Sequence, residues 1–148
     1  MCRILVVDDE EEVRSALARR LEREGYKVET AGSELEGLAA IKEADRPFDL
    51  VVTDMNMGDP NSGVRILEGA VERDVFTEVI VLTAYGNVSN AVETMKRGAF
   101  DYVEKNLPGV DVFELLVIKV EQAAQRRRHS LQMVRRLETF GGRRSVPS

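Results

Sequence analysis

Several features are scarce in this chain of 148 residues, and each scarcity narrows the class of protein. Cys2 is the only cysteine, so no disulfide can form within the chain. No apolar run approaches the roughly 18 residues that a membrane-spanning helix needs, and the N-terminus shows no signal-peptide pattern. The sequence therefore predicts a cytoplasmic protein that makes no contact with a membrane.

Charge is unevenly distributed along the chain. Residues 126–148 hold seven arginines and one acidic residue, a net charge of +6, and this leaves −11 for the remainder of a chain whose total is −5. The basic segment lacks the interleaved aromatic residues of a nucleic-acid-binding arm. We expect a globular domain over residues 1–125. Residues 126–148 are predicted to form a helical extension or linker that ends in a disordered tail and does not bind nucleic acid directly.

Apolar runs typical of buried strands alternate five times with segments of helical periodicity. The predicted strands are residues 3–7, 27–30, 49–53, 78–82 and 101–104. The predicted helices are residues 11–23, 33–44, 64–73, 87–97 and 111–139, and Gly141-Gly142 is expected to end the last one. Strands that alternate with helices in this way predict an α/β fold, with a doubly wound parallel sheet covered by helices on both faces.

Polar and charged side chains follow four of these strands at the point where each strand ends. They are Asp8 and Asp9, then Asp54, Thr83 and Lys105, at spacings of 45, 29 and 22 residues from Asp9 onward. Parallel strands end at one edge of a sheet, where ligands of open α/β folds bind. Clustered carboxylates need a cation, and their hard oxygen atoms favour Mg²⁺.

This set of groups is suited to a phosphoryl group. A carboxylate such as Asp54 can act as a nucleophile and form an aspartyl phosphate. A divalent cation and the Lys105 ammonium would balance the charge of the phosphoryl oxygens, and the Thr83 hydroxyl would donate a hydrogen bond to one of them.

The chain resembles the receiver domain of two-component response regulators over about residues 2–125. The resemblance rests on four motifs in this order: Ile4-Leu-Val-Val-Asp-Asp-Glu10, Asp54-Met-Asn-Met57, Thr83-Ala84 and Gly98-Ala-Phe-Asp-Tyr-Val-Glu-Lys105. It implies a flavodoxin-like (β/α)5 fold with strand order 2-1-3-4-5. It also implies that the domain is not an enzyme, since it catalyses only its own phosphorylation and dephosphorylation.

The resemblance implies a role for each matching residue. Asp54 would accept a phosphoryl group from a sensor histidine kinase or a phosphotransfer protein. Asp9 and Asp54 would bind Mg²⁺ directly, with the backbone carbonyl of Asn56 as a further ligand and Asp8 assisting through water. Lys105 would hold the phosphoryl oxygens.

The resemblance also implies a switch. Thr83 would hold a phosphoryl oxygen and move toward the phosphate, and Tyr102 would swing inward. The surface of the fourth helix, fifth strand and fifth helix would then change and signal to an output domain, a protein partner or a second copy of the chain. Tyr85 is predicted to shield the acyl phosphate from water.

The sequence departs from the family pattern at two places. Gly58 stands where the family usually has proline, and Gly63 comes one residue later than the usual glycine, so a slightly enlarged loop is expected there. Asp59 adds an anion to that loop. Asn106 replaces the proline that usually follows the lysine, so the Lys105–Asn106 peptide is either cis under strain or trans with Lys105 repositioned.

Other functions remain open at this point. A phosphorylation-independent interaction module of the same fold would not need Asp54. A phosphohydrolase would typically carry a second carboxylate at the position of Asn56, and a nucleotide-binding enzyme would need a glycine-rich turn after the first strand.

The role of the last helix is open as well. The chain is either a stand-alone receiver or part of a longer regulator. Its helix after Glu121 either forms a dimeric coiled coil, with Arg127 interrupting the apolar stripe, or packs on its own domain.

Overall fold

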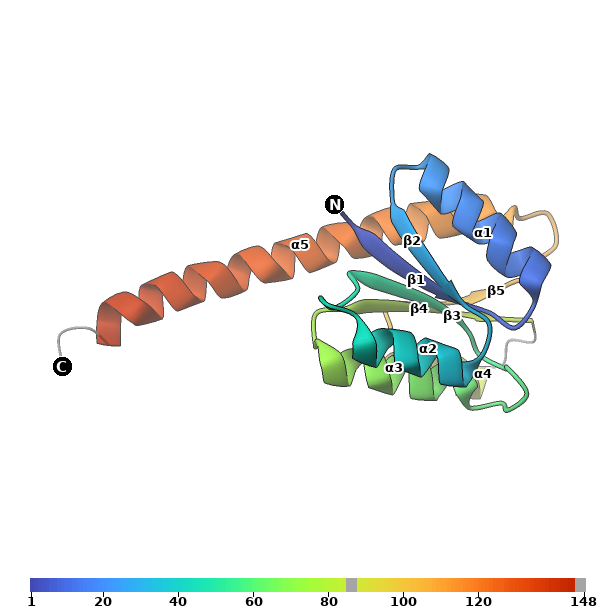
Figure 1. Ribbon diagram of the computed structural model, residues 1–148, viewed down its shortest axis with the longest axis horizontal. Coiled ribbons are helices and arrows are strands. Elements are labelled where there is room, and N and C mark those ends of the chain that lie inside the picture. The colour runs from blue at the N-terminus through green and yellow to red at the C-terminus, as the bar shows by residue number, and fades with distance from the viewer. Residues whose placement is uncertain (85–87, 146–148) are drawn as a thin grey trace.

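Five strands alternate with five helices along the chain. The computed structural model describes residues 1–84 and 88–145, with side chains described for residues 1–84 and 90–139. The strands are β1 (Arg3–Val7), β2 (Lys27–Ala31), β3 (Leu50–Asp54), β4 (Glu78–Thr83) and β5 (Asp101–Glu104). The helices are α1 (Glu11–Arg23), α2 (Glu34–Glu43), α3 (Ser62–Arg73), α4 (Val88–Lys96) and α5 (Val112–Ser145). All strand pairs are parallel, in the order β2-β1-β3-β4-β5 (Figure 1), which confirms the predicted fold.

Helices cover both faces of the sheet (Figure 1). α1 and the first half of α5 lie on one face, and α2, α3 and α4 lie on the other. Alternate residues of β1 enter the two cores: Ile4 and Val6 pack in the cluster that includes Leu116 of α5, while Leu5 and Val7 pack with Ile66 of α3. Because β1, β3 and β4 are covered on both sides, their sequences are continuous apolar runs, as is typical of parallel sheets.

Local sequence signals set several helix ends. The Ser33 hydroxyl accepts a hydrogen bond from the Glu36 backbone N–H at 3.1 Å, which caps α2 at the residue where the predicted helix begins. Asp111 does the same for α5, since its carboxylate accepts from the backbone N–H groups of Phe113 and Glu114. Gly25 follows α1 with φ of +96°, a conformation that favours glycine.

Strand β3 begins and ends one residue later than predicted. Asp54 pairs with Leu82 of β4 in the ladder, and the next backbone N–H, that of Met55, donates to the Leu82 carbonyl at 2.7 Å. The strand continues because β4 is long enough to supply a partner for this position, which the sequence of β3 alone does not reveal. Asp54 is therefore held in the sheet rather than in the loop that follows it.

Helix α5 also extends further than predicted. It does not end at Gly141-Gly142 but runs to Ser145, and its second half projects from the body (Figure 1). Glycine in a helix costs about 1 kcal/mol relative to alanine but does not prevent helical dihedral angles. Within the described residues, no helix is both long and apolar enough to cross a membrane.

Candidate functional site

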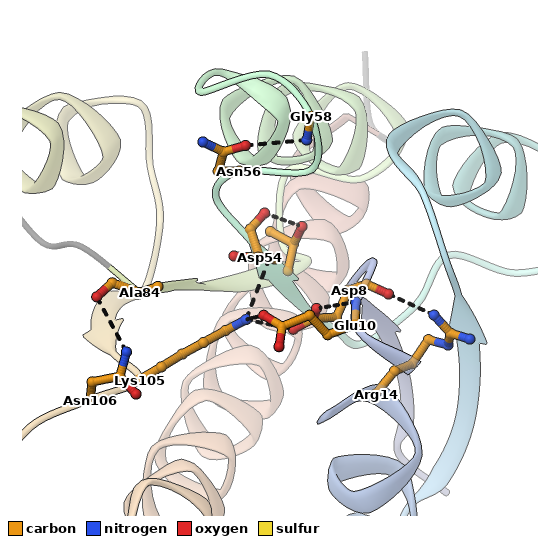
Figure 2. A network of polar contacts seen from close by, with 10 residues as sticks. Asp8, Glu10, Arg14, Asp54, Asn56, Gly58, Ala84, Lys105 and Asn106 are labelled. Carbon is orange, nitrogen blue, oxygen red and sulfur yellow. Dashed lines mark hydrogen bonds and ion pairs between the residues drawn. The ribbon is translucent and has the colours of Figure 1, made fainter. Parts of the chain in front are cut away.

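The strand ends bring the predicted site residues together at one edge of the sheet (Figure 2). Asp8 follows β1, Asp54 and Thr83 end β3 and β4, and Lys105 follows β5. Asp8, Asp54 and Thr83 are at most 5% exposed. A cavity of about 450 Å³ opens beside them, lined by Asp9, Glu10, Asp54, Met55, Asn56, Pro60, Thr83, Ala84 and Asn90.

The Lys105 ammonium lies among three carboxylates. Its Nζ is 2.9 Å from Asp8 Oδ2, 3.4 Å from Asp54 Oδ2 and 3.5 Å from Glu10 Oε1. No peptide bond among the described residues is cis, so the Lys105–Asn106 bond is trans. The trans bond still delivers the lysine to the site, and the Asn106 side-chain amide contacts the Ala84 carbonyl at 3.5 Å (Figure 2).

A fourth carboxylate, that of Asp9, belongs to the same cluster. Ligand atoms of Asp8, Asp9, Glu10 and Asp54 all lie within 4.8 Å of one another. One lysine cannot neutralise four acids at this separation, so the cluster keeps a net negative charge. Oxygen donors at such spacing fit a hard divalent cation such as Mg²⁺. Asp9 and Glu10 are exposed, which leaves their oxygens accessible from the cavity.

The ionisation of the site reflects this crowding. Burial, followed by the negative charges of Asp8 and Asp9, raises the pKa of Asp54 to about 6, although the ammonium of Lys105 opposes the change. For Lys105, burial lowers the pKa, but the hydrogen bond to Asp8 and the charges of Asp54 and Asp8 outweigh it, so the pKa is raised overall. The ammonium therefore stays protonated at neutral pH, whereas Asp54 is only moderately acidic in the absence of a metal ion.

The segment that carries Asp9 is held by contacts to its neighbour Asp8. The Asp8 carboxylate accepts from the Glu10 backbone N–H at 2.9 Å, and the Asp8 backbone carbonyl accepts from Arg14 Nη1 at 2.8 Å (Figure 2). The sequence pattern did not single out Arg14. A cation in the first turns of a helix opposes the helix dipole, and that unfavourable placement is the one signal that could have identified it.

The loop between β3 and α3 accommodates its unusual residues. The Asn56 side chain accepts from the Gly58 backbone N–H at 3.2 Å, and Gly58 has φ of +86°. Gly63 packs so closely that an added Cβ would lie 2.8 Å from the Met55 Cα. The anion at Asp59 pairs with Arg65 of α3 at 3.2 Å, so the following helix supplies the counter-charge.

Tyr102 is half-buried, and it packs against the cluster on the side of α2 and α3. Its hydroxyl is buried and has no hydrogen-bond partner in the structure. Tyr85, which the sequence predicts to shield the site, lies outside the described residues. Asn90, in the first turn of α4, lines the cavity although the sequence analysis did not select it.

Comparison with known proteins gives a consistent picture. A family model described as "Response regulator receiver domain" matches residues 4–116. The chain is 40% identical over 114 residues to the acid tolerance regulatory protein ActR of Sinorhizobium medicae, covering 77% of this chain and 57% of ActR. It is 38% identical over 118 residues to the photosynthetic apparatus regulatory protein RegA of Cereibacter sphaeroides, covering 80% of this chain and 62% of RegA. The chain thus spans little more than half the length of these relatives.

Solved structures with the same fold include one that carries a phosphorylated aspartic acid. That response regulator, from Burkholderia pseudomallei and bound to calcium and citrate, matches with a TM-score of 0.69 at 28% identity, over 93% of this chain and 75% of its own. The response regulator TrrA of Thermotoga maritima with Mg²⁺ and beryllofluoride matches with a TM-score of 0.68 at 30% identity, over 83% of this chain and 99% of its own. The beryllofluoride-activated NtrC4 receiver domain dimer matches with a TM-score of 0.74 at 35% identity, over 86% of this chain and 99% of its own.

Proposed function

The chain belongs to the receiver domain family of response regulators, and we propose that its Asp54 accepts a phosphoryl group from a phosphohistidine of a sensor kinase or phosphotransfer protein. A receiver domain is a signalling module rather than an enzyme. The observation that supports Asp54 is the Lys105 ammonium 3.4 Å from its carboxylate, inside a cluster of four acids. No other carboxylate of that cluster belongs to a strand of the sheet.

In the proposed reaction, an Asp54 carboxylate oxygen attacks phosphorus and the phosphorus–nitrogen bond of the phosphohistidine breaks. The imidazole leaves with the bonding electron pair and takes up a proton. Lys105 balances charge on one phosphoryl oxygen, and the Thr83 hydroxyl donates to another. Thr83 ends β4 and Lys105 follows β5, so both lie at the same edge of the sheet as Asp54. Positioning of this kind is the main contribution that a protein makes to phosphoryl transfer.

We assign the metal site to Asp9, Asp54 and the backbone carbonyl of Asn56, with Asp8 acting through water. The Asp8 carboxylate already accepts from Lys105 and from the Glu10 backbone, which is consistent with an indirect role. Bound Mg²⁺ would neutralise phosphoryl oxygens during transfer. The fit rests on the donor chemistry of the cluster, since carboxylate and carbonyl oxygens are the ligands that Mg²⁺ prefers.

Thr83 and Tyr102 are proposed as the switch that transmits phosphorylation to the surface of α4, β5 and α5. The buried Tyr102 hydroxyl makes no hydrogen bond in its present position, so packing alone holds the ring. A second packing arrangement of the ring would therefore not require a hydrogen bond to break. The surface carries exposed apolar side chains, among them Val92 and Met95 on α4 and Ile118 on α5. Exposed apolar side chains on these helices are consistent with a protein interface.

We propose that this surface binds either an output domain of a longer regulator, as the greater length of the relatives suggests, or a separate protein partner. The NtrC4 receiver is a dimer in its activated form, and a homodimer is proposed for this chain on that likeness. Direct contact with nucleic acid is not proposed for residues 1–148. A cytoplasmic location is proposed on the single cysteine alone.

The proposed function is tested by incubating the protein with Mg²⁺ and acetyl phosphate and then measuring its intact mass, with Asp54→Asn as the control. A gain of one phosphoryl group that the control loses supports a receiver. Rapid release of inorganic phosphate over many turnovers would instead indicate a phosphohydrolase. Failure to gain mass would leave a phosphorylation-independent interaction module as the better description.

A further inference from the structure

A cluster of ion pairs lies at the edge of the sheet where the strands begin, opposite the phosphoacceptor site. Arg127 of α5 places its Nε 2.7 Å from Asp49 Oδ1 and its Nη2 3.2 Å from Asp74 Oδ2. Its neighbour Arg126 pairs with Glu78 through two guanidinium nitrogens. These two arginines begin the basic segment that the sequence suggests is a solvated extension.

Partial burial separates the cluster from an ordinary surface ion pair, although 51% of the Arg126 side chain is exposed. Only 9% of the Arg127 side chain is exposed, and the same holds for Glu78. The Nη1 atom of Arg127 is buried and has no hydrogen-bond partner among the described residues. The Arg126 guanidinium also lies over the Phe100 ring, 4.6 Å from its centroid.

The three carboxylates belong to rigid parts of the body. Asp49 immediately precedes β3, and its other oxygen accepts from the Arg3 backbone N–H at 2.7 Å. Asp74 follows α3 and accepts from the Phe76 backbone N–H at 2.8 Å. Glu78 is the first residue of β4, and its backbone N–H donates to the Asp49 carbonyl at 3.1 Å. Backbone hydrogen bonds therefore help to position all three acidic residues, independently of the arginines.

The cluster lies near the point where α5 leaves the body (Figure 1). Apolar residues Val120, Ala123 and Ala124 hold the helix against the sheet up to this point. Leu131, one turn further on, still lines a cavity with Cys2 and Asp49. Beyond it the helix leaves the body (Figure 1), and exposed side chains such as Met133 and Leu137 follow. These ion pairs are the last ones between α5 and the body before the helix projects, among the described residues. They therefore lie where they can influence the direction of the projecting half.

We propose that Arg126 and Arg127 form a clamp that fixes the direction in which the second half of α5 leaves the receiver body. The clamp, comprising Arg126, Arg127, Asp49, Asp74 and Glu78, connects the helix to the starts of β3 and β4. The opposite ends of those strands carry Asp54 and Thr83. A segment joined to α5 is thereby carried in a fixed orientation relative to the site. The inference does not rest on phosphorylation of Asp54, since no clamp residue belongs to the site.

Limited trypsin digestion tests the clamp because the helix carries its own cleavage sites. The variants are Asp49→Asn with Asp74→Asn, and Glu78→Gln, which keep every arginine and an acceptor oxygen but remove the charge. Glu121→Gln, an exposed carboxylate of α5, is the matched control. We expect cleavage after residues 126–128 to accelerate about tenfold or more in the clamp variants, since charge-assisted bonds are lost and cleavage follows local opening. Cleavage after Arg135 and Arg136 should change less than about twofold.

Two outcomes of the digestion would overturn the proposal. One is unchanged cleavage after residues 126–128, which would mean that apolar packing alone holds the helix. The other is an equal acceleration at sites throughout the body, which would show that the ion pairs stabilise the whole domain and not the exit of the helix.

A distance measurement tests the direction itself. In the full chain with Cys2→Ser, spin labels on cysteines introduced at Glu22 of α1 and Glu138 of α5 report how the projecting helix stands relative to the body. A narrow distance distribution is expected with the clamp intact, and a clearly broader or shifted one with Asp49→Asn and Asp74→Asn. Identical distributions would overturn the proposal, even if trypsin sensitivity had changed.

Discussion

The two edges of the sheet both collect carboxylates, but one edge comes much closer to balancing their charge. Where the strands begin, Asp49, Asp74 and Glu78 are paired with two arginines of α5. Where the strands end, ligand atoms of four carboxylates lie within 4.8 Å of one another, and the ammonium of Lys105 contacts three of these carboxylates. We call the first the balanced edge, because its three acids and two arginines leave a net charge of only −1, and its ion pairs connect parts of the fold to one another. The second, unbalanced edge keeps oxygen donors of the kind that a hard divalent cation prefers.

The difference also appears in exposure. Arg127 and the acids it contacts are largely covered by protein, so their partners are fixed within the chain. Asp9 and Glu10 face an open cavity of about 450 Å³, where a partner from solution can enter. Acidic residues in parallel α/β folds thus acquire different functions according to whether the fold supplies their counter-charge.

The largest expected effect follows from removing the ammonium of Lys105, which contacts the carboxylates of the unbalanced edge. Lys105→Met should reduce the rate of phosphorylation by acetyl phosphate by at least about 100-fold, because the phosphoryl oxygens lose a preorganised charge. The matched variant Arg127→Met removes a buried cation from the other edge, and its rate should stay within about twofold of the native rate because the sites are distant. Rates are measured by intact mass over time. Equal losses in the two variants would contradict the distinction between the edges.

The unbalanced edge should also make stability depend on pH. Since the pKa of Asp54 is raised to about 6, the folded protein binds this proton more tightly than the unfolded chain does. The stabilisation is present at low pH and is lost as pH rises through about 6. In EDTA, Asp54→Asn should therefore be more stable than the native protein at pH 7.5, by at most about 3 kcal/mol.

The same gain should fall by roughly two thirds at pH 4.5, where the folded protein holds the Asp54 proton but the unfolded carboxyl is still largely ionised, and it should vanish only below about pH 4. Urea unfolding of both proteins at the two pH values measures the difference. Asp49→Asn serves as the control from the balanced edge, and it should show no gain in stability at pH 7.5. A gain for Asp54→Asn that is equal at both pH values would show that the carboxylate charge is not its source.

Stabilisation of the protein by Mg²⁺ should depend on residues of the unbalanced edge and not on those of the balanced edge. At a Mg²⁺ concentration of 100 times its dissociation constant, the native protein should gain about 2.7 kcal/mol in free energy of unfolding. Asp9→Asn should lose most of that gain, whereas Glu78→Gln should keep it. Thermal unfolding with EDTA and with increasing Mg²⁺ provides the measurement. Full stabilisation of Asp9→Asn by Mg²⁺ would remove Asp9 from the proposed ligands.

Periodicity and turn chemistry predicted the elements well because both are local. Ser33 caps α2 where the sequence placed it, and the strand ends meet at one edge because parallel strands must do so. The ladder position of Asp54 was not predictable from β3, since it depends on the length of β4.

Contacts between distant segments were predictable only where strand order imposes them. Lys105 and Asp8, 97 residues apart, meet because both follow parallel strands at the same edge of the sheet. No such rule predicts the pairing of Arg127 with Asp49, 78 residues apart. Arginines in a basic segment have the composition of a solvated linker, and only the packing of α5 on the sheet shows which two of them find acids. Gly63 was noticed as a displaced family glycine, but its close approach to the Met55 backbone follows from the three-dimensional path of the loop.

The smallest expected effect contrasts two buried hydroxyls. The Thr77 hydroxyl, near the balanced edge, donates to the Phe48 carbonyl at 2.7 Å, whereas the Tyr102 hydroxyl, near the site, has no partner. Thr77→Val should cost about 1–2 kcal/mol, because the carbonyl is left unsatisfied. Tyr102→Phe removes an unsatisfied group, and should leave the free energy of unfolding unchanged or raise it by less than about 1 kcal/mol.

Urea unfolding of both variants in EDTA at one pH gives the comparison. A loss for Tyr102→Phe as large as that for Thr77→Val would mean that the Tyr102 hydroxyl is bonded in solution. The ring would then be held in place by more than packing. In that case the proposed switch would have to break a hydrogen bond when Tyr102 moves. A switch held by packing alone requires instead that Tyr102→Phe cost less free energy of unfolding than Thr77→Val.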